Sequence, residues 1–117
     1  MENQEHVDSA TLTMLQEILE DGFAGLLQTF ISDTAERLVQ LQSALESQDC
    51  DSVRRGAHSI KGSASNLGAH KLAGFASELE AKGRDEDLSG TENLLDNIRS
   101  EYQEVEVIMQ GILKDIE

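Results

Sequence analysis

Apolar residues recur along this chain at alternating steps of three and four residues, the spacing that places side chains on one face of an α-helix. The first series predicts a short helix from Ser9 to Leu19. After a break at Asp21-Gly22, a long amphipathic helix is predicted to continue to about Ser47. The inward positions of this long helix are Phe23, Leu27, Phe30, Thr34, Leu38, Leu41 and Leu45.

Three more helices are predicted in the second half of the chain. The turn "SQDCD" supplies an aspartate as N-cap for the first of them, and Gly68 is placed to end it in the left-handed conformation. The next is expected to stop at Gly83, and the capping-box sequence "SGTE" from Ser89 to Glu92 begins the last. The inward positions are Val53, Ala57, Ile60, Ala64 and Leu67, then Leu72, Phe75, Ala76 and Leu79, and finally Leu95, Ile98, Tyr102, Val105, Met109, Ile112 and Ile116.

The predicted fold class is all-α. The chain has no proline, and it lacks the runs of β-branched and aromatic residues that are typical of strands. Four amphipathic helices joined by short connections predict an antiparallel up-down four-helix bundle, with a short additional helix at the N-terminus. We expect a single domain over residues 1–117, in which residues 1–8 form a flexible tail.

The charge of the chain limits the partners it can bind. With 23 acidic and 9 basic residues, its net charge is −14. This charge argues against binding nucleic acid or an anionic membrane surface, because both are themselves negative.

No apolar run approaches the length of a membrane span, and the acidic start "MENQEHVDSA" does not resemble a signal peptide. The single cysteine, Cys50, excludes an internal disulfide, and we expect a monomeric cytoplasmic protein.

His58 lies in a stretch whose charge is opposite to that of the whole chain. Residues 53–77 contain no Asp or Glu. The basic residues of this stretch are Arg54, Arg55, Lys61 and Lys71. They predict a local positive field on a negative protein. At roughly 100° per residue, His58 points about 140° away from the apolar position Val53 and therefore outward.

The outward neighbours of His58 are suited to receiving an anion. They are Arg54, Lys61, Gly62 and Ser65, one or two helical turns away. A glycine inside a helix costs about 1 kcal/mol relative to alanine, and Gly62 removes bulk one turn from the ring. An imidazole, the Lys61 ammonium and cleared space together suit a phosphoryl group.

Other interpretations of His58 are a surface histidine with chance neighbours and a metal ligand. His6, His58 and His70 lack the tight spacing of metal ligands, so no metal site is expected. His6 is expected in the tail, and His70 in a solvated turn or first helical turn. The alternative function is a non-catalytic helical interaction module whose positive face binds an acidic partner.

The sequence "AHSIKGSASNLGA" resembles the His-x-x-Lys-Gly-Ser signature of histidine-containing phosphotransfer (HPt) domains. The order and lengths of the predicted helices, including the short leading helix, are similar to this family along essentially the whole chain. The chain therefore resembles a stand-alone member of the bacterial two-component multistep phosphorelays.

The resemblance implies a relay of phosphoryl groups between aspartates. The donor would be the receiver domain of a hybrid sensor histidine kinase, and the acceptor the receiver domain of a response regulator. His58 would be the phosphoacceptor, reacting through Nε2, with Lys61 beside the phosphoryl oxygens, Gly62 giving access and Ser65 as a supporting neighbour. No cofactor is expected on this chain, because the family's partners hold the Mg²⁺. We expect a phosphocarrier without ATP-dependent kinase activity.

Two further sets of residues follow from the resemblance. Receivers in the family dock on an apolar patch of the first two helices, which here would be Met14, Ile18 and Leu26, with Lys61 and Arg54 at its rim; the alternative for the three apolar residues is ordinary burial. Leu12, Leu15 and Leu19 would cover the bundle.

A glutamine 22 residues after the histidine often holds the ring in this family, and Glu80 occupies that position here. A carboxylate accepts a hydrogen bond from Nδ1–H as an amide oxygen does. The alternative is that Glu80 is one more solvated acid.

Overall fold

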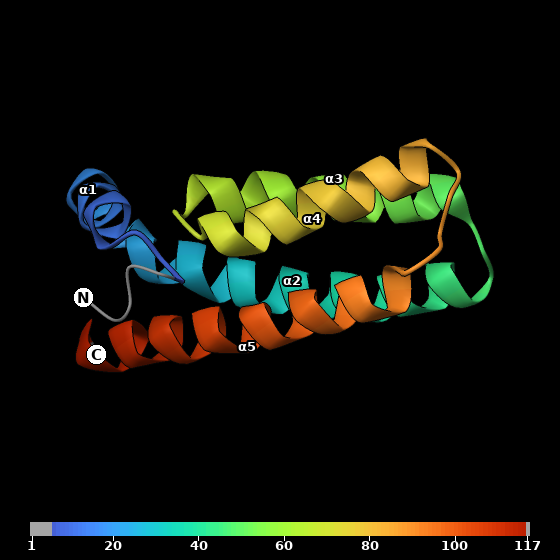
Figure 1. Cartoon of the computed structure of the whole chain (residues 1–117). Helices are drawn as coiled ribbons and strands as arrows, with labels where there is room; N and C mark the ends of the chain where they lie inside the picture. The colour runs from blue at the N-terminus through green and yellow to red at the C-terminus, as the bar shows by residue number, and fades with distance from the viewer. Residues whose placement is uncertain (1–5, 117) are drawn as a thin grey trace.

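The computed structural model describes residues 6–116, and over this range the chain forms five α-helices and no strand. The helices are α1 (Ser9–Leu19), α2 (Gly22–Glu46), α3 (Cys50–Asn66), α4 (His70–Arg84) and α5 (Thr91–Ile116). Helices α2 to α5 form a bundle in which the pair α3–α4 lies on the pair α2–α5, and α1 crosses one end (Figure 1). The predicted all-α bundle is confirmed. Among residues 6–116, no helix combines the length and the apolar content needed to span a membrane.

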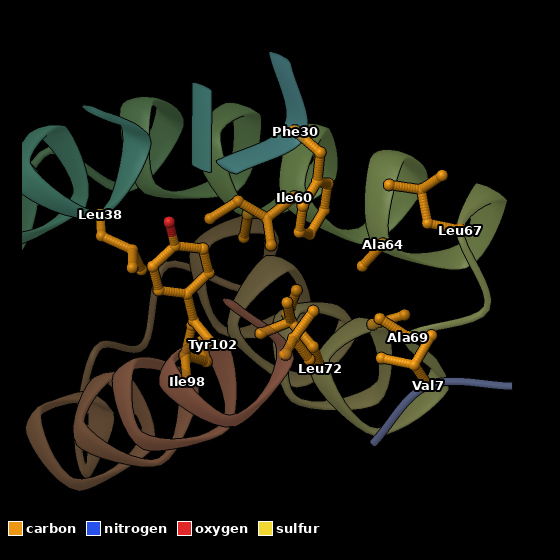
Figure 2. Close-up of a cluster of buried hydrophobic side chains, with 14 of the residues drawn as sticks. Val7, Phe30, Leu38, Ile60, Ala64, Leu67, Ala69, Leu72, Ile98 and Tyr102 are labelled. Carbon is orange, nitrogen blue, oxygen red and sulfur yellow. The ribbon is translucent and has the colours of Figure 1, made fainter. Parts of the chain in front are cut away.

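The apolar rows predicted from the spacing fill the space among the four long helices. Figure 2 shows side chains from several helices converging there. Its labelled members include Phe30 and Leu38 of α2, Ile60 and Ala64 of α3, Leu72 of α4, and Ile98 and Tyr102 of α5. The Tyr102 hydroxyl donates a 2.8 Å hydrogen bond to the carbonyl of Ile31 and so joins α5 to α2. Burial, with a further contribution from Glu106, raises the pKa of Tyr102 to about 12, so the phenol remains a donor at neutral pH.

The N-terminal segment belongs to the packed domain from residue 6 onward. Val7 is 1% exposed and lies beside Ala69 (Figure 2). The backbone N–H of Asp8 donates to the carbonyl of Gly68 at 2.9 Å, and the Asp8 side chain caps α1. The predicted flexible tail is therefore wrong for residues 6–8, including His6, because this segment buries a side chain and pairs with the α3–α4 turn. Residues 1–5 lie outside the described residues.

The turn between α3 and α4 is the one predicted at Gly68. Gly68 has φ +79°, its N–H donates to Ser65 O at 3.1 Å, and the N–H of Ala69 donates to Ala64 O at 2.8 Å. These two bonds form a Schellman motif, which satisfies the last carbonyls of the helix. A Cβ at Gly68 would also lie 3.0 Å from the Cβ of Thr11, so glycine is required here by conformation and by space.

Gly83 does not stop its helix, as the sequence had predicted, because α4 continues to Arg84. Gly83 is buried where α4 crosses the start of α3. A Cβ placed on it would lie 2.7 Å from the backbone N of Arg54 and 2.8 Å from the carbonyl O of Cys50. The glycine therefore permits close backbone approach of α3 and α4, and the helix simply ends one residue later.

The two end regions of the bundle also differ from the expected pattern. Ile112 is half-buried and Ile116 exposed, whereas Leu113 is buried. An α-helix has 3.6 residues per turn, so positions seven residues apart move gradually around the helix and away from the face that packs on the core. Leu19 is exposed at the end of α1. Helix α5 begins at Thr91, and the hydroxyl of Ser89 donates to Asp87, so the start of α5 is shifted from the predicted capping box.

Candidate functional site

Helix α3 presents His58 to solvent because its opposite face is buried in the bundle. The apolar row of α3 is Val53, Ala57, Ile60 and Ala64, all fully buried. His58 lies outside this row, and its side chain is 63% exposed. The outward orientation predicted from the helical angle is confirmed.

One carboxylate from α4 joins the ring of His58 to the ammonium of Lys61. Oε2 of Glu80 lies 2.8 Å from Nδ1 of His58, and Oε1 of Glu80 lies 2.6 Å from Nζ of Lys61. The Glu80 side chain is only 16% exposed. The interpretation of Glu80 as one more solvated acid is therefore wrong, and the contact expected from its position is present.

The protonation state of Glu80 determines which ring nitrogen carries the hydrogen. The hydrogen bond from Lys61 and, to a smaller extent, the one from His58 lower the pKa of Glu80, although its burial acts in the opposite direction. Glu80 is thus ionised at neutral pH and has no proton to donate. The hydrogen in the contact must belong to Nδ1 of His58, so a neutral ring has its lone pair on Nε2.

The other predicted neighbours of His58 differ in how they contribute. A Cβ at Gly62 would meet nothing within 4 Å, so the space that it leaves beside the ring is open to an incoming molecule. Ser65 is exposed two turns from His58, and no hydrogen bond joins its side chain to the ring in the described part of the chain. Of these predicted neighbours, Glu80 is the one that hydrogen-bonds to the ring.

The positive field predicted for this region is largely neutralised in the folded protein. Each of its four cations lies beside a carboxylate. The pairs are Arg54 with Asp51 at 2.9 Å, Arg55 with Asp51 at 3.1 Å, Lys61 with Glu80 at 2.6 Å and Lys71 with Glu101 at 3.8 Å. Residues 53–77 contain no acid themselves, but the fold places carboxylates from other segments beside their cations. This pairing removes the main support for a module that binds acidic partners through a positive face.

The residues predicted as a docking patch lie on α1 and α2. Met14 is 52% and Ile18 67% exposed, so core burial, the alternative for these two residues, is wrong. Leu26 is half-buried and packs against the core. Arg54 is held by Asp51, as described above. The patch is carried by the same end of the bundle as the α3–α4 turn (Figure 1).

Two side-chain contacts of the folded protein were not predicted from the sequence. Asp51 pairs with both arginines of α3, and its spacing of three and four residues from them would have indicated this. His6 contacts Glu101 at 2.8 Å, which no local pattern predicts because the residues are far apart in the chain. Within residues 6–116, no three or more His, Cys, Asp or Glu side chains gather in a way that could hold a metal ion.

The fold and this cluster define a class of protein, a small helical bundle that exposes one histidine held by a carboxylate. The family model described as "Hpt domain" matches residues 25–107. This segment is most of the chain and contains the whole cluster of His58, Lys61, Gly62 and Glu80. The chain belongs to the Hpt domain family.

Known proteins that are similar to it include a solved structure and a curated relative. The crystal structure of histidine-containing phosphotransfer protein B (HptB) from Pseudomonas aeruginosa PAO1 matches with a TM-score of 0.92 and 37% sequence identity, covering 94% of this chain and 96% of that one. The phosphorelay intermediate protein rdeA of Dictyostelium discoideum is 28% identical over 90 residues, which are 77% of this chain and 35% of that protein. The chain therefore spans about a third of the length of this curated relative.

Proposed function

We propose that this chain is a histidine phosphotransfer protein that carries a phosphoryl group on His58 and relays it between aspartates of receiver domains. The observation that carries the proposal is the different environment of the two ring nitrogens of His58. Nδ1 is engaged by Glu80 at 2.8 Å, and Nε2 of an exposed imidazole is left as the nucleophile. Membership of the Hpt family supports the same function.

The reaction is a displacement at phosphorus. The lone pair on Nε2 of neutral His58 attacks the phosphorus of an aspartyl phosphate. The N–P bond forms as the P–O bond to the aspartate breaks, and the electron pair of that bond leaves with the carboxylate. The onward step is the reverse, with a second aspartate as nucleophile. Lys61 lies one turn from His58 and supplies positive charge beside the phosphoryl oxygens, and Gly62 leaves room for in-line approach.

The proposed partners are the receiver domain of a hybrid sensor histidine kinase and the receiver domain of a response regulator. They would dock on the exposed Met14 and Ile18 and the half-buried Leu26, and any Mg²⁺ that the transfer needs would be held by the receiver. The relay would operate in the cytoplasm, and the lone Cys50 suits a reducing compartment. The chain would act as a phosphocarrier and would not take its phosphoryl group from ATP.

Changing His58 to Gln tests the proposal. The parent protein, incubated with a receiver domain that carries radiolabelled aspartyl phosphate, should acquire label that is acid-labile and base-stable. His58→Gln should acquire none, because the amide has no nucleophilic nitrogen, and its helical circular dichroism signal should match that of the parent.

His70→Gln is the matched control, since His70 is an exposed histidine at the start of α4, and it should be labelled like the parent. Incubation with radiolabelled ATP alone should label neither protein. Label that persists in His58→Gln, or that disappears in His70→Gln, would contradict the assignment of His58.

A further inference from the structure

Glu80 brings a negative charge to the ring nitrogen that does not carry the phosphoryl group. Its Oε2 is 2.8 Å from Nδ1 of His58, and its other oxygen is anchored by Lys61 at 2.6 Å. The carboxylate is mostly buried, and the ring beside it is exposed. The position of Oε2 is thus set by α4 and by the contact of the other oxygen with Lys61.

The charge on the ring changes during the proposed transfer. A neutral imidazole that attacks through Nε2 keeps its hydrogen on Nδ1 and becomes a positively charged phosphoimidazolium. When the N–P bond breaks in the onward step, the electron pair of that bond returns to Nε2, and the ring leaves as neutral imidazole only if Nδ1 still carries its proton. A ring that has lost this proton would have to leave as an imidazolate anion, a much poorer leaving group.

We propose that Glu80 is a positioning residue that holds the Nδ1 proton of phosphorylated His58. The domain therefore remains able to donate its phosphoryl group up to a higher pH than it would with an uncharged side chain at position 80. This inference rests on the proposed function, and it assigns a task to the charge of Glu80 as well as to its shape. An opposite charge in direct contact favours the charged form of a group, and here the charged form is the reactive donor.

The cations near His58 oppose this effect, because a like charge disfavours the charged form of the ring. On its own helix these charges are Arg54 and Lys61, one turn away on either side, and on α4 the group in contact is Glu80 itself. Arg54 is paired with Asp51, and Lys61 binds the oxygen of Glu80 that is not in contact with the ring. Because the ring is exposed, water screens each of these interactions and keeps its effect modest.

Glu80→Gln tests the inference, because the amide keeps the shape and an acceptor oxygen but removes the charge. Parent and variant are phosphorylated with phosphoramidate, a small-molecule donor that needs no partner protein. Transfer to a receiver domain and loss of phosphoryl to water are then measured from about pH 6 to about pH 10. The alkaline decline of both rates should occur about one pH unit lower in Glu80→Gln than in the parent.

Glu78→Gln is the matched control, since it removes the same charge from an exposed position of α4, and its profile should coincide with that of the parent. Coincident profiles for Glu80→Gln and the parent would overturn the inference. If Glu80→Gln does not fold, ¹⁵N NMR of the phosphorylated parent decides instead, because a ring whose Nδ1 proton is lost at or below about pH 6.5, where an unperturbed imidazole loses it, contradicts the proposal. Label absent from His58 would refute the proposed function, whereas label on His58 with coincident profiles would refute only the role of Glu80.

Discussion

Gly62 is a residue whose missing side chain weakens its helix. It lies inside α3, one turn beyond His58, and a Cβ there would meet no atom within 4 Å. Packing therefore does not require glycine at this position, although alanine would favour the helix by about 0.5–1 kcal/mol. The open space matters for a partner that must bring an aspartyl phosphate in line with Nε2, and in the proposed function this access offsets the loss of helix stability.

Gly62→Gln should raise the free energy of unfolding by a few tenths of a kcal/mol or more, because glutamine is the better helix former. The same change should slow transfer from a phosphorylated receiver by about tenfold, equal to about 1.4 kcal/mol of activation free energy, because the side chain crowds the ring. Urea denaturation and single-turnover labelling measure the two effects. Gly74→Ala, at an equally open position of α4, should stabilise the fold and leave transfer unchanged; slower transfer there would mean that Gly62 has no special role.

The pair of helices α3 and α4 is the element on which the site depends. His58 and Lys61 belong to α3 and Glu80 to α4, so the distances of 2.8 and 2.6 Å to the carboxylate are set by how closely the two helices approach. Gly83 permits that approach at the far end of the pair from the Gly68 turn. The Schellman motif at Gly68 fixes the other end.

Gly83→Ala should lower the free energy of unfolding by about 1–3 kcal/mol, because the new Cβ would overlap the backbone of α3 and force the helices apart. Separation of the helices should also lengthen the contact between Glu80 and His58, which NMR would detect as a changed tautomer population of the ring. Gly74→Ala again serves as the control and should not destabilise. An unchanged urea midpoint for Gly83→Ala would show that the helices tolerate the added carbon.

At the scale of the whole molecule, α1 and the segment before it are secured across the end of the bundle. Val7 is buried, Asp8 pairs with Gly68, and His6 contacts the buried Glu101 of α5. These contacts place α1 so that Leu12 faces the core while Met14 and Ile18 face solvent. The exposed residues Met14 and Ile18 therefore lie on a helix that these contacts hold in place. A surface of this kind suits docking of a receiver domain.

Ile18→Asp should weaken binding of a receiver domain by about tenfold, because a charge would have to be desolvated within an apolar contact. It should leave the unfolding temperature near that of the parent, since Ile18 is mostly exposed. Titration calorimetry and thermal unfolding separate the two effects. Val107→Asp, an equally exposed valine on α5, is the control and should not change the affinity. A large drop in the melting temperature of Ile18→Asp would assign the residue to the fold instead.

The sequence by itself determined the helices and the side of α3 on which His58 lies. Apolar rows at three- and four-residue steps depend only on neighbours within a helix, and so do the glycine that ends α3 and the open position of Gly62 beside His58. The positions of Gly83, Leu113 and the N-terminal segment were not predictable in this way, because each is decided by packing against another element.

Only the tertiary structure decided the charge around His58. Residues 53–77 contain no acid, yet the folded domain gives Lys61 and Lys71 carboxylate partners from α4 and α5. Glu80 is 22 residues from His58, and whether it touches the ring depends on the rotation and spacing of two packed helices, to which a local pattern is insensitive. The position of Glu80 was readable from the sequence, but its bridge between the imidazole and the ammonium was created by the packing of α4 on α3.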